Sequence, residues 1–401
     1  MLFKELQILK DTLEPYTSIV LGPYFNTGLL LVFGLIFALI LYIIPNKFKF
    51  VLAGSILFAL LSSTLANFII FFAIVLILYF CSNYNFKFRA IVFWITEALM
   101  LISNMIIYRI FGYHSSFYSF VAYYTMYRTI HYYVDLNQGS MQKLKLIDYL
   151  AYLFYFPSFS HGPVERVENL HPEQVKKENV LVGFKRIVIG IAKYALLVYV
   201  LSRVEEVPFS FSNFWQWLVL TAYVGAIKLY VLLSGDIDIV IGVSALMGFK
   251  VSENFPKFPY MQPTLTKFWQ NWQATIVNWL TAYVYFPLCR NRKHVYAKTM
   301  IIIMIIGWAH LFYYFKDFPS IEYIMYYTLW GVFLGGTLAL SKIWGKKKAE
   351  SKQIWQQKYP AIAKIIYSEN YLTKAMRIFI TFNIIAIGWL SPLYILLKQL
   401  I

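Results

Sequence analysis

Long apolar runs separated by short polar segments recur along most of the chain. A helix that crosses the roughly 30 Å hydrocarbon core of a bilayer needs about 20 consecutive, mostly apolar residues. Many of the runs approach that length, so the pattern predicts a series of spanning helices. The clearest of them cover residues 27–45, 90–111, 184–201, 215–233, 299–315, 321–340 and 378–397.

Three further apolar stretches have a less regular pattern. Residues 50–80 are too many for one span, and the polar residues 62–64 divide them, which predicts two short or tilted helices. Residues 117–136 and 146–159 are interrupted by polar side chains and by Pro157, so we expect these helices to face protein or a cavity. The whole pattern predicts an all-α, polytopic integral membrane protein with about 10 or 11 transmembrane or re-entrant helices.

Composition and charge support this class. Of the 401 residues, 60% are hydrophobic and 14% are charged, whereas soluble domains carry about 25% charged residues. The formal net charge of +17 would suggest nucleic-acid binding in a soluble protein. Here the basic residues cluster in short loops beside apolar runs, so we expect membrane lipid as a partner and no nucleic acid. Cys81 and Cys289 form no disulfide or metal-binding pattern, and no metal site is predicted.

Two basic loops predict the orientation in the membrane. They cover residues 290–298 and 342–358, and two predicted spans separate them. Both loops therefore lie on the same side, which the positive-inside rule assigns to the cytoplasm.

His310 is an ionisable residue inside a predicted span, where insertion of a charged side chain costs about 2.5–3.5 kcal/mol. It lies some 16 Å from the cytoplasmic end of that span, at about 1.5 Å per residue, which is near the bilayer midplane. An imidazole there could serve as a general base on a hydroxyl. The alternative is a neutral histidine that forms a hydrogen bond between helices.

Residues 268–288 combine tryptophans with side-chain amides. Gln273 and Asn278 carry amides able to hold an acyl carbonyl or a nucleophile. For the tryptophans we favour an amphipathic interfacial helix with an aromatic belt. Helical spacing would place one stripe of side chains along such a helix: Trp269, Trp272 or Gln273, Ile276, and Trp279 or Leu280.

Two other polar segments interrupt apolar sequence. Asp236 and Asp238 are two residues apart and would point in different directions on a helix, so we expect them to cap a helix start or to pair with Lys228 or Arg128. Prolines and a glycine within residues 156–166 predict a broken helix, which is either a re-entrant turn lining a tunnel or an interfacial loop.

Together these segments resemble the membrane-bound O-acyltransferase family, in the bacterial branch that includes alginate O-acetyltransferases and teichoic acid D-alanyl transfer proteins. Four matches occur in the family's order, and a weaker one follows at residues 380–389. The resemblance covers residues 117–395. The four matches are residues 160–166 (SHGPVER), residues 234–255 (SGDID through GF to ENF), residues 268–288 (FWQNW through WL to YVYFPL) and residues 307–310 (GWAH).

The resemblance implies a fold and a set of site residues. It implies helices around a central tunnel, with N-terminal transmembrane helices in residues 1–116 and a catalytic core in residues 117–401. His310 and Gln273 take the catalytic positions. The implied substrate-binding residues are Trp269, Trp272, Asn278, Trp279, Tyr283, Asp236, Asp238, His161 and Arg166.

The chain departs from the family pattern at three points. Gln273 stands where the family usually has histidine or asparagine, and glutamine cannot act as a base near neutral pH. Thr281 and Ala282 replace an acidic position, and Ala309 separates the tryptophan from His310. We favour a site that operates on His310 with Gln273 as a polar orienter over a diverged member with weak or altered activity.

The implied function is transfer of an acyl group, which we expect to be acetyl, to a hydroxyl outside the cytoplasm. The co-substrate would be an acyl-CoA or acyl carrier protein thioester, with no bound cofactor, and the acceptor an envelope glycan or a partner protein. The implied location is a bacterial cytoplasmic membrane. Alternatives are D-alanyl transfer to teichoic acid, a non-catalytic scaffold of a glycan-export complex, and a transporter, although a transporter is expected to show inverted repeats.

Overall fold

A computed structural model describes the chain over residues 25–43, 47–62, 65–111, 116–159, 162–170, 177–201, 214–291, 293–314, 321–367 and 370–388. All the regular elements in these residues are helices, as the hydropathy pattern predicts. The chain divides into two compact units. Unit 1 comprises residues 1–200 and 231–253, and unit 2 comprises residues 201–230 and 254–401.

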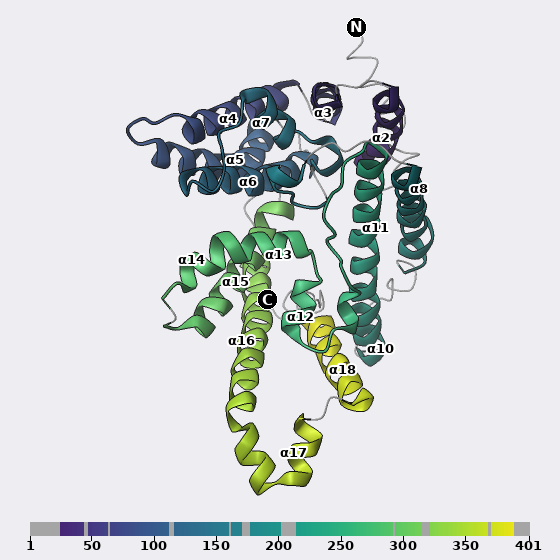
Figure 1. Cartoon of the computed structure of the whole chain (residues 1–401), viewed down its shortest axis with the longest axis vertical. Helices are drawn as coiled ribbons and strands as arrows, with labels where there is room; N and C mark the ends of the chain where they lie inside the picture. The colour runs from purple at the N-terminus through teal and green to yellow at the C-terminus, as the bar shows by residue number, and fades with distance from the viewer. Residues whose placement is uncertain are drawn as a thin grey trace. The chain divides into compact units, whose positions relative to one another are not determined.

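The first helices of unit 1 follow the apolar runs closely (Figure 1). The predicted division at residues 62–64 is confirmed, because one helix ends at Ser62 and the next begins at Leu65. These helices are α2 (Phe25–Ile43), α3 (Lys47–Ser62), α4 (Leu65–Asn83), α5 (Arg89–Phe111) and α6 (Ser116–Asn137).

Unit 1 also contains the broken helix predicted near Pro157. Helix α7 (Leu146–Leu153) ends before that proline, and the residues described between it and residue 170 form two short 3-10 turns, Phe156–Ser158 and Val167–Asn169. Irregular backbone at membrane depth needs hydrogen-bond partners from protein or water. Arg128 of α6 supplies them, since its fully buried guanidinium donates to the carbonyls of Tyr152 and Leu153 and to both oxygens of Ser158.

The acidic pair lies in the middle of a helix, which corrects the expected helix start. Helix α10 (Phe214–Val219) continues through a π-helical turn (Leu220–Val224) into α11 (Gly225–Leu246). The apolar stretch long enough to cross a membrane is residues 222–246 rather than residues 215–233. The sequence after Asp238 is again apolar, and Asp238 is paired with cations, so nothing ends the helix at the carboxylates.

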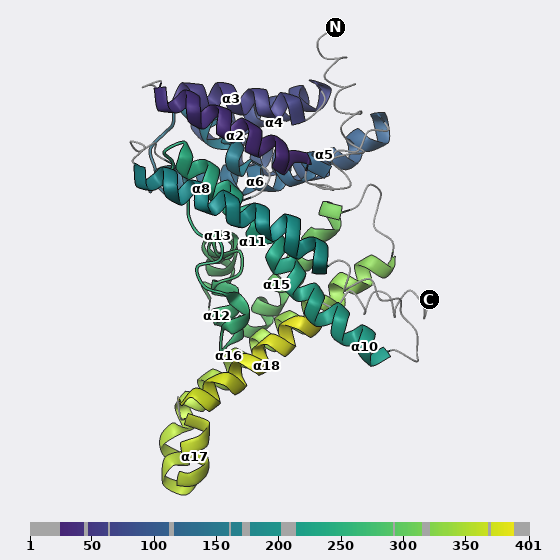
Figure 2. The same ribbon diagram turned by 90° about the vertical axis from the view of Figure 1, so that its right-hand side faces the viewer.

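Glycines bring α11 close to α8 (Lys177–Ala192), which the structure places beside it (Figures 1 and 2). A Cβ added at Gly242 would lie 2.7 Å from the carbonyl oxygen of Gly183. One at Gly190 would lie 2.7 Å from the carbonyl oxygen of Gly235. Small residues at helix contacts allow backbones to approach in this way in membranes.

We expect Gly242→Ala to destabilise the protein by about 1–3 kcal/mol, because the added methyl group forces α8 and α11 apart. A lower Tm of the purified protein in detergent would be the measurement. The matched control is Gly336→Ala in another helix, where an added Cβ meets no atom within 4 Å. Equal Tm values for the two variants would contradict the close packing of α8 on α11.

Unit 2 contains an antiparallel hairpin of α15 (Val295–Tyr314) and α16 (Ile321–Lys358). The helices are in contact where Gly307 meets Tyr327 and where Gly335 meets Met300, so residue numbers rise along one helix as they fall along the other. Helix α16 continues well past the predicted end at residue 340, because lysines, alanine and glutamines extend it as good helix formers. Helices α17 (Pro360–Tyr367) and α18 (Tyr371–Gly388) follow (Figure 2). Gly388 of α18 lies against Leu334 of α16.

Within the described residues, three helices are long and apolar enough to cross a membrane: residues 222–246, 324–358 and 371–388. Shorter apolar helices cover residues 50–60, 68–83, 274–289 and 295–307. An all-α membrane protein is therefore the class observed, while the expected 10 or 11 membrane segments and the central tunnel stay predictions.

Candidate functional site

Gln273 lies at a break between two short helices of unit 2. Helix α12 (Leu265–Gln270) ends before it, and α13 (Ala274–Leu280) begins directly after it. The backbone of Gln273 is left-handed, with φ 46° and ψ 51°. The single helical stripe expected from residue 269 to residue 280 is therefore wrong, because the chain turns at residues 271–273.

Asn254 holds this break together. Its carbonyl accepts a hydrogen bond from the N–H of Ala274 (2.9 Å), and its side-chain Oδ1 accepts from the N–H of Thr275 (3.3 Å) and from the Thr275 hydroxyl. Its Nδ2 donates to Oε1 of Gln273 at 2.7 Å. The first N–H groups of a helix have no partner within the helix, so Asn254, which is fully buried, caps α13 from a distant part of the sequence.

The other predicted residues of this segment differ in burial. Trp272 is 5% exposed and stacks on Phe268, with ring centroids 5.5 Å apart, which is core packing and not a lipid-facing belt. Trp279 is also buried, and its ring lies 5.4 Å from that of Tyr283. Trp269 and Tyr283 are half-buried, and Asn278 is exposed.

Two predicted site residues lie outside the residues whose side chains the structure describes. His310 belongs to α15, as expected of the predicted span, but its side chain is not among those described, so its role stays a prediction. His161 lies outside the described residues altogether. Gly162, next to it, has a left-handed φ of 104°, and a Cβ there would lie 2.7 Å from Val240, so glycine is required at this turn.

Arg166 is exposed at the end of the broken-helix segment. Its guanidinium lies 3.9 Å from the carboxylate of Asp135, which also lies 3.1 Å from Nδ1 of the buried His131. The preceding residue, Glu165, is buried and accepts hydrogen bonds from the N–H and hydroxyl of Ser252. Contacts within unit 1 thus hold Glu165 and Arg166 in place.

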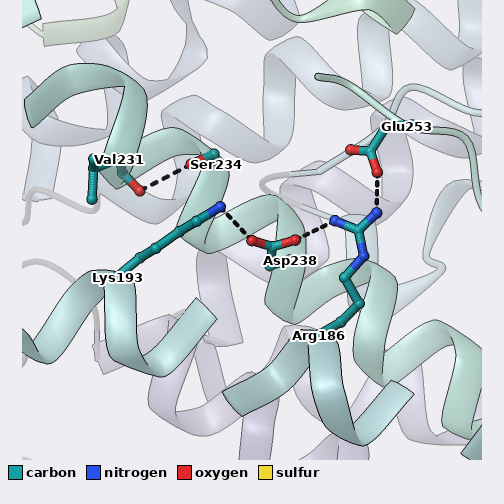
Figure 3. A network of polar contacts seen from close by, with 6 residues as sticks. All are labelled: Arg186, Lys193, Val231, Ser234, Asp238 and Glu253. Atoms are coloured by element: carbon teal, nitrogen blue, oxygen red, sulfur yellow. Dashed lines mark hydrogen bonds and ion pairs between the residues drawn. The ribbon is translucent and has the colours of Figure 1, made fainter. Parts of the chain in front are cut away.

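Asp238 is the centre of an ionic network in unit 1 (Figure 3). One of its oxygens pairs with Arg186 of α8, and the other lies 2.5 Å from Nζ of Lys193. Arg186 also pairs with Glu253. For Asp238 the expectation of a basic partner is confirmed, and its partners are these two cations rather than Lys228 or Arg128. Asp236 is buried in the same helix.

Asn254 and Arg186 received no role from the sequence, and Arg128 received a different one, as a partner of the acidic pair. Asn254 lies within the ENF match, but its partner Gln273 is 19 residues away, and no spacing rule connects them. Arg128 and Arg186 carried a usable signal, since each is a cation within an apolar segment.

Comparison with known proteins places these features in a family. Residues 80–368, more than half of the chain, match the membrane-bound O-acyltransferase family. The chain belongs to this family. Its members are membrane-bound, and together with the long apolar helices this identifies a multi-pass membrane protein.

Several bacterial proteins are similar to this family member. A "probable alginate O-acetylase" of Pseudomonas syringae is 28% identical, over 66% of this chain and 46% of its own length. The teichoic acid D-alanyltransferase of Streptococcus thermophilus is 24% identical, over 67% of this chain and 66% of its own. The peptidoglycan O-acetyltransferase of Helicobacter pylori is 24% identical, over 41% and 33%. The chain spans less than half the length of the alginate O-acetylases it matches.

Proposed function

We propose that this protein is an O-acyltransferase that moves an acyl group from a cytoplasmic thioester to a hydroxyl of the cell envelope. The observation that carries the proposal is the constrained Gln273. A non-glycine residue in the left-handed region costs of order 1–3 kcal/mol and is found preferentially at functional sites. Gln273 is held there by a buried residue, at a position where the family motif has a catalytic polar residue.

In the proposed reaction, His310 accepts the proton of the acceptor hydroxyl while the hydroxyl oxygen attacks the thioester carbonyl. The carbonyl oxygen carries negative charge in the tetrahedral intermediate, and Gln273 lies nearby as a polar group. The carbon–sulfur bond then breaks, and the proton on His310 passes to the departing thiolate. The products are an ester and a free thiol, so no redox partner or metal is needed for balance.

The remaining site residues have supporting roles in this proposal. The catalytic core runs over residues 117–401, after the helices of residues 1–116. Asp238 is held by cations and fixes α8 to α11, while Arg166 and His161 are proposed to bind substrate. The family resemblance assigns substrate binding to Trp269, Trp272, Asn278, Trp279 and Tyr283 of unit 2 and to Asp236 of unit 1, and each keeps that role in the proposal.

Acetyl transfer to an envelope glycan is the preferred reaction, with acyl-CoA or an acyl carrier protein as donor. It is supported by the similarity to proteins named alginate O-acetylase and peptidoglycan O-acetyltransferase. D-Alanyl transfer is the second candidate. The match covers 66% of the teichoic acid D-alanyltransferase, compared with 46% of the alginate O-acetylase. Membrane lipid surrounds the enzyme, and the acceptor is a glycan or a partner protein outside the cytoplasm.

Release of thiol from two thioesters tests this proposal. The purified protein in detergent is incubated with acetyl-CoA or with a D-alanyl carrier-protein thioester, and free thiol is measured over time. Release from acetyl-CoA above the protein-free rate supports the acetyl reaction, and release from the carrier alone supports the D-alanyl reaction. A folded protein that releases thiol from neither donor would contradict the enzyme and favour a membrane scaffold.

A further inference from the structure

The hydrogen bonds around Asn254 determine which end of the Gln273 amide is turned toward Asn254. A backbone N–H can only donate, and the N–H of Thr275 points at the side chain of Asn254 at 3.3 Å. The atom that receives this bond must therefore be Oδ1 of Asn254. The other end of the same side chain is then Nδ2, which is a donor.

The orientation of Asn254 fixes that of its neighbour. Nδ2 of Asn254 lies 2.7 Å from the Gln273 side chain, so the atom it meets must be the acceptor, Oε1. The amide nitrogen of Gln273, Nε2, is consequently directed away from Asn254. Gln273 as a whole is half-buried, at the break between α12 and α13.

We propose that Asn254 is a positioning residue that presents Gln273 as a hydrogen-bond donor, and that Gln273 stabilises the negative oxygen formed when the thioester carbonyl is attacked. This inference rests on the proposed acyltransferase function and extends it. Gln273 was described above as a polar orienter. Its role is now specific: Nε2 of Gln273 donates a hydrogen bond to the acyl oxygen. A glutamine can fill this role without being a base.

The two chemical roles open to Gln273 respond in opposite ways to Gln273→Glu. A carboxylate of the same size accepts the bond from Asn254 with one oxygen and places an acceptor where Nε2 was. If Gln273 donates to the acyl oxygen, Gln273→Glu is as slow as Gln273→Ala. If Gln273 accepts a bond from the attacking hydroxyl, Gln273→Glu stays active.

Asn254→Asp tests the positioning residue. The aspartate keeps an acceptor for the N–H and hydroxyl of Thr275, but its second oxygen cannot donate and instead attracts Nε2 of Gln273. The amide then reverses and presents Oε1 to the substrate. We expect kcat to fall by about 10²–10³-fold, the usual cost of losing one such donor, with little change in KM for the thioester.

Controls separate this effect from a loss of structure. Asn370→Asp makes the same substitution at a residue whose Oδ1 also accepts a backbone N–H, that of Thr373 at the start of α18 (2.9 Å), and we expect wild-type kcat. The double variant Asn254→Asp, Gln273→Ala should be no slower than Gln273→Ala. If Asn254→Asp does not fold, as judged by Tm and gel filtration, Gln273→Glu against Gln273→Ala decides the donor role alone.

The experiment measures steady-state thiol release and acyl transfer with acetyl-CoA for these variants. The inference is supported if Gln273→Glu and Asn254→Asp both have a low kcat. It also requires that the double variant Asn254→Asp, Gln273→Ala has the same kcat as Gln273→Ala alone. An active wild-type enzyme in which Gln273→Glu or a folded Asn254→Asp keeps full kcat would overturn it and leave the acyltransferase function standing. A folded wild-type protein that is inactive with both thioester donors would overturn the proposed function and this inference with it.

Discussion

Substitution of His310 by alanine is expected to lower the rate of acyl transfer by about 10²–10⁴-fold, the range that general-base catalysis contributes. His310 lies on α15, a mostly apolar helix, where an ionisable side chain is costly and points to a functional site. His310→Asn should be equally slow, because an amide keeps a polar side chain but cannot take up the hydroxyl proton. The measurement is the initial rate of labelled acetyl transfer.

The control for His310 is a second histidine beside the same helix. His294 is exposed, just before α15 begins, and has a left-handed φ of 56°. Asparagine tolerates that conformation, so His294→Asn should keep both Tm and the wild-type rate. A folded His310→Ala protein that transfers acetyl at the wild-type rate would show that another group removes the proton.

The largest expected effect on stability is at Arg128. We expect Arg128→Met to lower the free energy of unfolding by about 3–5 kcal/mol, because it leaves several buried acceptors without a donor, each at a cost of roughly 1–3 kcal/mol. The acceptors are the carbonyls of Tyr152, Leu153 and Ser158 and the Ser158 hydroxyl. The protein should show a much lower Tm in detergent and faster proteolysis between α7 and the turn at Gly162.

Arg290→Met is the matched control for this variant. Arg290 is exposed, and a surface substitution of this kind usually changes stability by less than about 0.5 kcal/mol. Its Tm should match that of the wild type. If Arg128→Met and Arg290→Met had equal Tm values, the broken-helix segment would have to obtain its donors from elsewhere, and the structural role assigned to Arg128 would be wrong.

Hydrophobic periodicity was sufficient for most helix positions in this chain. The boundary at residues 62–64 and the break near Pro157 follow from local composition, because polar or proline residues interrupt an apolar run there. The position of α11 did not follow. Two carboxylates suggested a helix start, whereas Arg186 of α8 and Lys193, directly after α8, neutralise Asp238 and allow one helix to pass through. Such pairing depends on residues about 50 positions away.

The candidate site shows the same limit. The motif at residues 268–288 located Gln273, and residue type predicted that it would bind a polar group. Helical spacing predicted one continuous stripe, because no glycine or proline marks a break at residues 271–273. The left-handed turn exists because Asn254 supplies the capping bonds for α13. A long-range hydrogen bond therefore overrode local helix propensity, and sequence spacing carries no sign of it.

The central claim is that this chain transfers an acyl group from a thioester to a hydroxyl on the other side of a membrane. Proteoliposomes that contain the purified protein and an enclosed envelope polysaccharide extract, with radiolabelled acetyl-CoA outside, test it most directly. The account predicts enclosed label that is released by mild alkali, as an ester is, and that is lost in His310→Ala vesicles. The claim would be contradicted if the protein is folded and the label stays on the thioester, both with acetyl-CoA and with a carrier-protein donor.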